Sequence, residues 1–125
     1  MPYAAIEGLT GDQTECGQIL ATLKERRDTT VDLLNAIEGV HCLRPNATFY
    51  LWPNVTGVME KTGLTDYDNF RKTVLKETGV SFCTRLHFGR PLEGEDNFYI
   101  RLAYSGIKLP EIREGLGKFK AFIGG

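Results

Sequence analysis

The chain has 125 residues, of which 42% are hydrophobic and 25% charged, a composition typical of one globular domain and unlike that of a disordered or fibrous protein. Its 15 basic and 16 acidic residues give a formal net charge of -1, and no basic cluster interleaves with aromatic residues, so nucleic acid is not an expected partner. Because the sequence has neither a basic start followed by an apolar stretch nor an apolar run of membrane-spanning length, we expect a cytoplasmic protein without a membrane segment.

The first predicted element is a long helix over residues 11–39. Its apolar residues recur at steps of three and four, and Gly39 is a natural helix end. Arg27 falls on the apolar stripe, where its stem can lie on the core while its guanidinium reaches water. The charged run 25–28 is otherwise expected to be a solvated face. The stripe consists of Leu20, Leu23, Val31, Leu34 and Ile37.

A strand and a second helix are predicted in the middle of the chain. Residues 48–52 are dense in β-forming residues, and Pro53 ends the strand because proline cannot donate a hydrogen bond to a sheet. After a loop that contains glycine, residues 65–68 resemble a helix cap with an acidic first turn. Gly79 closes this helix, and its apolar face is formed by Phe70, Val74 and Leu75.

Two further strands and a last helix complete the chain. Residues 80–83 are a short predicted strand, and residues 97–105 are a longer one with strict alternation of its side chains. Pro110 stands in the first turn of the last helix, where proline is tolerated. The apolar stripe of this helix consists of Leu109, Ile112, Leu116, Phe119 and Ile123.

The order helix, strand, helix, strand, strand, helix predicts an α/β fold. We expect a two-layer sandwich, in which a small, mainly antiparallel sheet of three to four strands packs against helices. No internal repeat, low-complexity tract or linker rich in Pro and Ser divides the chain. Residues 1–125 are therefore expected to form a single domain.

Arg101 is the residue that the strand pattern singles out. It lies in the middle of the last predicted strand, with Tyr99 and Ala103 on its face and strongly apolar residues on the other. One interpretation is that this face is the solvated side of a half-buried sheet. The other is an anion site, because a guanidinium grips a carboxylate with two parallel hydrogen bonds. The pattern alone leaves both interpretations open.

Zinc binding is the less favoured interpretation of the cysteines and histidines. His41 and Cys42 are adjacent, which makes simultaneous ligation awkward, although Cys83 and His87 have a more suitable spacing. An odd count of three cysteines without a Cys-x-x-Cys pair suits free, reduced thiols. We therefore expect no metal site, and we predict that Cys16, Cys42 and Cys83 are buried small side chains rather than activated nucleophiles.

Three stretches of the sequence carry a resemblance to a known family. The first consists of residues 25–28 and 34–40. The second is residues 45–53, similar to a family strand of the form Pro-x-Gly-Ala-Phe-Tyr-x-x-Pro. The third runs from residues 88–89 into residues 99–105. In this order they resemble the C-terminal part of class I and II, or fold type I, pyridoxal-phosphate-dependent aminotransferases of the aspartate aminotransferase type.

The resemblance implies roles for two residues. In that family the arginine of the third stretch binds the substrate α-carboxylate, and this position is Arg101 here. The Phe of the Phe-Gly pair, Phe88 in this chain, lies near the substrate entrance in the family. The chain also departs from the family pattern, because Thr84–Arg85 stands where Pro-Gly is usual, and the strand glycine appears as Asn46 or Ala47.

The resemblance also implies that the reactive centre lies outside this chain. In the family, the Schiff-base lysine, the aspartate facing the pyridine nitrogen and the phosphate-binding residues belong to a large domain upstream. The resemblance implies a homodimeric parent enzyme that uses pyridoxal phosphate to move an amino group between an amino acid and a 2-oxo acid. The chain alone is expected to hold no cofactor and to be inactive. The alternative is a stand-alone small α/β module that binds an anion or another ligand.

Overall fold

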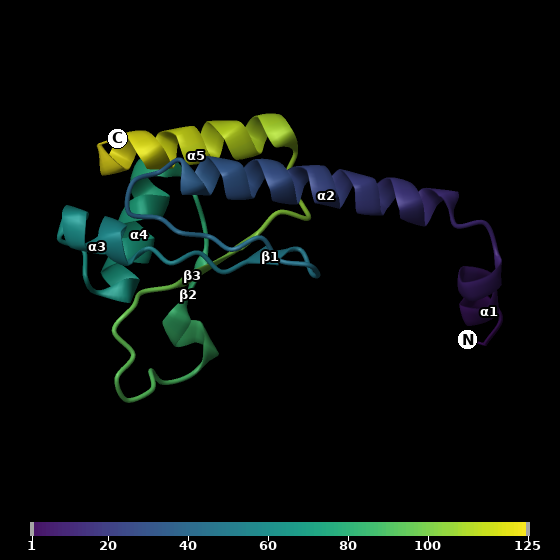
Figure 1. Ribbon diagram of the computed structural model, residues 1–125, viewed down its shortest axis with the longest axis horizontal. Helices are drawn as coiled ribbons and strands as arrows, with labels where there is room; N and C mark the ends of the chain where they lie inside the picture. The colour runs from purple at the N-terminus through teal and green to yellow at the C-terminus, as the bar shows by residue number, and fades with distance from the viewer. Residues whose placement is uncertain (1, 125) are drawn as a thin grey trace.

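The computed structural model describes residues 2–124, in which helices and short strands follow one another (Figure 1). The elements are α1 (Pro2–Thr10), α2 (Thr14–Asn35), β1 (Tyr50–Leu51), α3 (Thr56–Thr62), α4 (Tyr67–Thr78), β2 (Cys83–Thr84), the 3-10 helix η1 (Arg85–Phe88), β3 (Ile100–Ala103) and α5 (Leu109–Ile123). The sequence pattern predicts neither α1 nor α3 nor η1.

The three strands form an antiparallel sheet in which β3 lies between β1 and β2. Cys83 of β2 pairs with Arg101 of β3. The predicted α/β fold, with a small antiparallel sheet packed against helices, is confirmed. β3 is shorter than the predicted strand 97–105, because Tyr99 pairs with Asn54 only through an isolated bridge.

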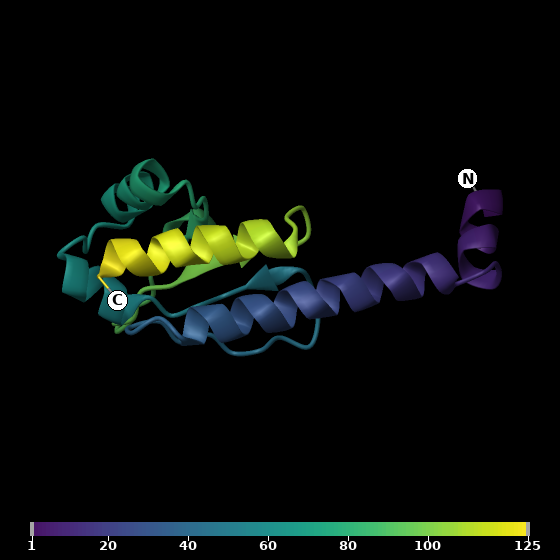
Figure 2. The ribbon, with the colours of Figure 1, turned by 90° about the horizontal axis from the view of Figure 1, so that it is seen from above.

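The core lies between one face of the sheet and the helices. α2 and α5 run side by side along the sheet in both views (Figures 1 and 2). The predicted stripe of α5 is confirmed, because Ile112, Leu116 and Phe119 are buried. Ile100 and Tyr104 contribute inward side chains from β3 and its end. Burying an apolar side chain of this size stabilises the fold by about 1.5–3 kcal/mol.

The first half of α2 projects away from this body and carries α1 at its tip (Figures 1 and 2). No residue of α1 is buried, and its apolar residues Tyr3, Ile6 and Leu9 are exposed. The predicted stripe is wrong for Leu20, which is exposed because this part of the helix extends past the layers it would pack on. Leu34, which lies over the body, is buried as predicted.

The segment after α2 is fixed by a contact between two glycines. α2 ends at Asn35, before the predicted end at Gly39, and Gly39 adopts a left-handed φ of 89° in the following turn. A Cβ atom on Gly57, in the first turn of α3, would lie 2.7 Å from the Cα atom of Gly39. The two backbones therefore approach this closely only because neither residue has a side chain.

α4 confirms most of the predicted second helix. Asp66 caps its N-terminus, as the cap-like residues 65–68 predict, because the Asp66 carboxylate accepts a hydrogen bond from the Asn69 N–H. The prediction is wrong for Leu75, which is exposed because it points away from the face that buries Val74. The first residue of α4 also contacts the residue before β3, because the Tyr67 hydroxyl accepts a hydrogen bond from the Tyr99 N–H at 3.0 Å.

Candidate functional site

Alternation along β3 divides its side chains between the two faces of the sheet. Ile100 is buried in the core, so Arg101 lies on the opposite face, away from the helices. Tyr50 of β1 pairs with Ala103, which shares the Arg101 face. Around the guanidinium a set of rings gathers, which we name the aromatic face. It consists of Tyr50, Trp52, Phe88 and Tyr99 together with Arg101.

The Arg101 guanidinium is held against two of these rings. Its central carbon lies 4.2 Å from the centre of the Tyr50 ring and 4.8 Å from the centre of the Phe88 ring. One guanidinium nitrogen, Nη2, also donates to the Cys83 sulfur at 3.6 Å. A cation over a ring gains about 0.5–2 kcal/mol, depending on how far water is excluded. The rings therefore fix the position of the charge without neutralising it.

Arg101 has no acidic ion-pair partner in the part of the chain that the structure describes. Among residues 2–124, no Asp or Glu oxygen lies within 4.0 Å of its guanidinium nitrogens, whereas other arginines form ion pairs. The half-buried guanidinium therefore keeps hydrogen-bond donors for an added anion. Of the two interpretations left open by the strand pattern, this geometry favours the anion site.

The other rings of the aromatic face pack on one another. The Trp52 ring meets Phe88 edge-on with 5.4 Å between ring centres, and it stacks on Tyr99 at 5.9 Å. Both Trp52 and Phe88 remain partly exposed, with exposed fractions of 41% and 46%. Large exposed aromatic groups of this kind mark binding surfaces. Tyr50 and Trp52 were not predicted as site residues, although their spacing of two places them on one strand face.

A hollow opens beside the aromatic face. Tyr50, Trp52 and Tyr99 line one side of it. Residues of the segment that precedes β1 close the other side. These are His41, Leu43 and Pro45. The hollow is therefore joined to the Arg101 site through Tyr50, although neither Arg101 nor Phe88 lines it.

The unusual Thr84–Arg85 pair starts η1, and its side chains are occupied within the loop. His87 Nδ1 accepts a hydrogen bond from the buried Thr84 N–H at 3.0 Å. Arg85 forms an ion pair with Glu95, with 2.8 Å between Nε and Oε1. Nδ1 of His87 and the Arg85 guanidinium are therefore engaged within the loop that carries Phe88.

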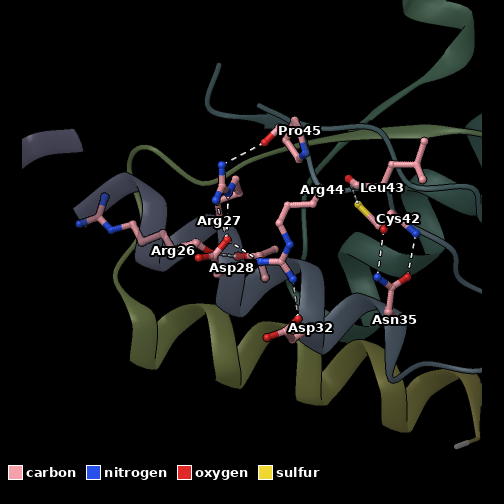
Figure 3. A network of polar contacts seen from close by, with 10 residues as sticks. Arg26, Arg27, Asp28, Asp32, Asn35, Cys42, Leu43, Arg44 and Pro45 are labelled. Atoms are coloured by element: carbon pink, nitrogen blue, oxygen red, sulfur yellow. Dashed lines mark hydrogen bonds and ion pairs between the residues drawn. The ribbon is translucent and has the colours of Figure 1, made fainter. Parts of the chain in front are cut away.

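A network of charged groups ties the segment before β1 to α2 (Figure 3). Arg27 donates to the Pro45 carbonyl at 3.1 Å, and Arg44 reaches back to Asp28 and Asp32. The Arg27 guanidinium, with a smaller effect from Arg44, holds the pKa of Asp28 below its ordinary value. The predicted solvated face is thus wrong for Asp28, which is half-buried because this segment covers it, whereas Arg27 is half-buried as expected from its place on the apolar stripe.

The same segment is also bound through its backbone. The Asn35 side chain accepts a hydrogen bond from the Cys42 N–H at 2.8 Å and donates to the Cys42 carbonyl at 2.9 Å (Figure 3). An amide that satisfies both backbone groups of one residue acts as a substitute for a strand neighbour. The chain that leads to the hollow is therefore fixed at both ends of residues 42–45.

The cysteines differ in their surroundings. Cys42 is buried as predicted, and burial raises the pKa of its thiol to about 11, so it is protonated at neutral pH. Cys83 is half-buried. The prediction is wrong for Cys16, which is exposed because it lies on the projecting half of α2. Within residues 2–124, no three or more His, Cys, Asp or Glu side chains gather where they could hold a metal ion.

The lysines of the described chain do not fit a covalently held cofactor. A lysine that forms a Schiff base needs a desolvated position that lowers its pKa. Every lysine here is exposed, and Lys61, Lys72 and Lys118 are engaged by carboxylates. The full set is Lys24, Lys61, Lys72, Lys76, Lys108, Lys118 and Lys120.

The helices between residues 2 and 124 include none that is long and apolar enough to span a membrane.

Comparison with known proteins identifies relatives over nearly the whole chain. The family described as aminotransferase class I and II matches residues 1–119. An asparagine–oxo-acid transaminase from Streptococcus mutans is 36% identical over 121 residues, which are 97% of this chain and 29% of that protein. An aspartate/prephenate aminotransferase from Cereibacter sphaeroides is 36% identical over 132 aligned residues, covering 98% of this chain and 30% of that protein.

Solved structures agree on the fold. The aspartate aminotransferase from Rhizobium meliloti superposes with a TM-score of 0.80 at 24% identity, over 97% of this chain and 30% of that one. The present chain thus spans about 30% of the length of the relatives it matches.

Proposed function

The chain belongs to the class I and II aminotransferase family, and from this premise we propose that it is the C-terminal, substrate-side domain of an aminotransferase. The complete enzyme moves an amino group between an amino acid and a 2-oxo acid. The match to about 30% of the length of the relatives supports a domain that works with a larger remainder of the same polypeptide. The three free cysteines suit a reducing, cytoplasmic setting.

The observation that carries this proposal is the state of Arg101. Its guanidinium is fixed by Tyr50 and Phe88 and meets no carboxylate among residues 2–124. In the complete enzyme it binds the α-carboxylate of the amino acid through two parallel hydrogen bonds. Each charge-assisted bond of this kind contributes about 1.5–3 kcal/mol. Binding at the carboxylate also orients the amine, which lowers the entropic part of the barrier.

The cofactor belongs to the remainder of the enzyme. Pyridoxal phosphate supplies an electron sink for the carbanion chemistry of transamination. The exposed lysines of this chain do not fit its attachment, so we assign no cofactor contact here. The domain instead binds and orients the substrate, and the chain alone is inactive.

The exposed rings support a second role, that of a lid. Phe88 and Trp52 present apolar surface around Arg101, and in the complete enzyme this surface closes over the substrate and excludes water. Phe88 lies at the rim of the site, near the substrate entrance. The parent enzyme acts as a homodimer in this proposal, with amino acids and 2-oxo acids as its ligands and no nucleic acid or membrane as a partner.

One other function is favoured by a specific observation. Arg101 is accessible in the chain as it stands, so a stand-alone module that binds carboxylates is the alternative. The reading frame upstream of residue 1 separates the two. An open frame that encodes a lysine in a segment rich in Ser and Gly supports the aminotransferase, whereas a genuine start codon at Met1 supports the module.

The test of the proposed function compares two proteins. The product of the complete gene and the 125-residue chain are each incubated with pyridoxal phosphate, an amino acid and a 2-oxo acid, and the new amino acid is measured. We expect transamination by the complete enzyme alone. Activity of the isolated chain, or none in the complete enzyme with any amino acid, contradicts the proposal.

A further inference from the structure

The loop between η1 and β3 is organised by one ion pair. Arg85 contacts both carboxylate oxygens of Glu95, with distances of 2.8 Å from Nε to Oε1 and 3.2 Å from Nη2 to Oε2. This is the forked geometry in which a guanidinium and a carboxylate bind most strongly. It joins the start of the loop to a point ten residues later.

The same two side chains also bind the backbone between them. Arg85 donates to the carbonyls of Gly89 and Arg90, both at 3.2 Å. Glu95 accepts a hydrogen bond from the Leu92 N–H at 2.8 Å. Residues 89–97 contain no helix or regular strand, so they lack the regular backbone hydrogen bonds of those elements. The bonds from Arg85 and Glu95 fix the path of the loop in their place.

This ion pair is more shielded from water than the others in the described chain. The side chains of Arg85 and Glu95 are 15% and 18% exposed, whereas every other pair has at least one partner exposed by 36% or more. Screening by solvent is therefore weakest here.

The position of Phe88 depends on this loop. Phe88 is the last residue of η1, and Gly89, whose carbonyl Arg85 holds, follows it with a φ of 111° that favours glycine. The Phe88 ring lies 4.8 Å from the guanidinium carbon of Arg101 but is itself 46% exposed. With so much of the ring in water, the core alone does not hold it in place.

We propose that Arg85 and Glu95 are positioning residues that hold the Phe88 ring over the Arg101 guanidinium and thereby shape the carboxylate site. They act through Phe88 and through the loop, without touching the substrate. Thr84–Arg85 stands where the family pattern has Pro-Gly, so this chain uses an ion pair where a rigid turn is usual. The kinetic consequence rests on the proposed function, whereas the placement of Phe88 does not.

Trp52 provides a direct readout of this placement. It is the single tryptophan of the chain, and its ring contacts Phe88 edge-on. The variants are Glu95→Gln, which keeps the size of the side chain, and Glu95→Ala. The matched control is Glu93→Ala, which removes an exposed carboxylate with no ion pair among residues 2–124. Circular dichroism of each variant establishes that the helices are retained.

We expect both Glu95 variants to release Phe88 from Trp52. The tryptophan emission then shifts to the red and acrylamide quenching rises above the wild-type value, because the indole loses its edge-on partner while it keeps the stack on Tyr99. Glu93→Ala leaves emission and quenching unchanged. If Glu95→Ala and Glu95→Gln both keep the wild-type emission and quenching, the inference is wrong. If the alanine variant loses its helices, the glutamine variant gives the decision.

Steady-state kinetics of the complete enzyme test the consequence for the site. We expect Glu95→Gln to raise the KM for the amino acid about tenfold while kcat changes less, because a displaced ring misplaces the carboxylate clamp. Arg85→Lys, which keeps the charge but not the fork, gives an intermediate KM. An unchanged KM in Glu95→Gln overturns the assignment of a positioning role. A wild-type enzyme without transaminase activity contradicts the proposed function and leaves the fluorescence result standing.

Discussion

The guanidinium carbon of Arg101 lies 4.2 Å from the centre of the Tyr50 ring, so a residue of β3 rests on a residue of β1 across the sheet. This contact joins the candidate anion site to the strand that borders the hollow. A charge held in this way is oriented before a ligand arrives, which reduces the entropy lost on binding.

Replacing Tyr50 with Leu removes the ring and leaves the apolar strand position filled. We expect the KM of the complete enzyme for its amino acid to rise about threefold to tenfold, equivalent to a cation–ring contact of about 0.7–1.4 kcal/mol. Tyr50→Phe is the matched control, because it retains the ring and loses only the hydroxyl. Equal KM values for Tyr50→Leu and the wild type would show that the ring does not position Arg101.

Gly57→Ala tests the contact between the turn after α2 and the start of α3. The new Cβ would lie 2.7 Å from the Gly39 Cα, so the two backbones must separate. We expect the free energy of unfolding to fall by about 1–3 kcal/mol, as for other overpacked sites. Urea denaturation measures the change.

Gly17→Ala is the control, because a Cβ on this α2 residue meets no atom within 4 Å. Gly17 lies in the first turn of α2, so its replacement is expected to stabilise the chain by no more than about 0.5–1 kcal/mol, the value typical of a helix interior. A Gly57→Ala variant as stable as the wild type would show that the close approach of the glycines is not needed.

The three thiols are expected to react at different rates at neutral pH. Burial raises the pKa of Cys42 from 9.0 to about 11, so its reactive thiolate is scarce at neutral pH. A colorimetric thiol reagent should therefore modify the exposed Cys16 first and Cys42 last. The opposite order would contradict the burial of Cys42.

The same shift predicts a loss of stability in alkali. A raised pKa in the folded state means that unfolding releases the Cys42 proton above pH 9.0, so unfolding becomes easier as the pH rises toward about 11. Cys42→Ala should show a weaker decline of the urea midpoint over this range. Identical declines in the two proteins would exclude Cys42 as the cause.

Asp28→Asn tests the network that binds the segment before β1. Because Arg27 and Arg44 lower the pKa of Asp28, its stabilising charge is present above its ordinary pKa of 3.8 and is lost as the pH falls through the lowered value. The variant should therefore be less stable than the wild type at neutral pH, with a difference that vanishes in strong acid. Glu25→Gln, an exposed neighbour, serves as the control. A difference that persists at the lowest pH would point to packing instead of charge.

Local patterns predicted the parts of the fold that bury their side chains within this chain. The stripe of α5 and the cap of α4 follow from spacing and residue type, and the structure confirms both. Arg101 stood out because a cation in mid-strand breaks the apolar alternation of β3. The prediction of buried side chains is wrong in the first half of α2. Leu20 and Cys16 are exposed there, because no other element of the described chain covers them.

The surroundings of Arg101 were harder to predict, because they depend on contacts distant in sequence. The register that places Tyr50 beside Arg101 follows from strand pairing, which one sequence does not specify. The ion pair between Arg85 and Glu95 spans an irregular loop without any periodic signal. Contacts of this kind could not be predicted from the sequence, because neither strand pairing nor an irregular loop leaves a local pattern.

The central claim is that Arg101 binds the substrate carboxylate, and the most direct measurement is kcat/KM for several amino acids in the complete enzyme carrying Arg101→Ala. We expect a fall of about a hundredfold or more for every amino acid, because two charge-assisted hydrogen bonds are lost. Arg101→Lys should recover only part of the activity, since lysine lacks the fork, and the exposed Arg113→Ala on α5 should match the wild type. Wild-type kcat/KM in Arg101→Ala would contradict the account.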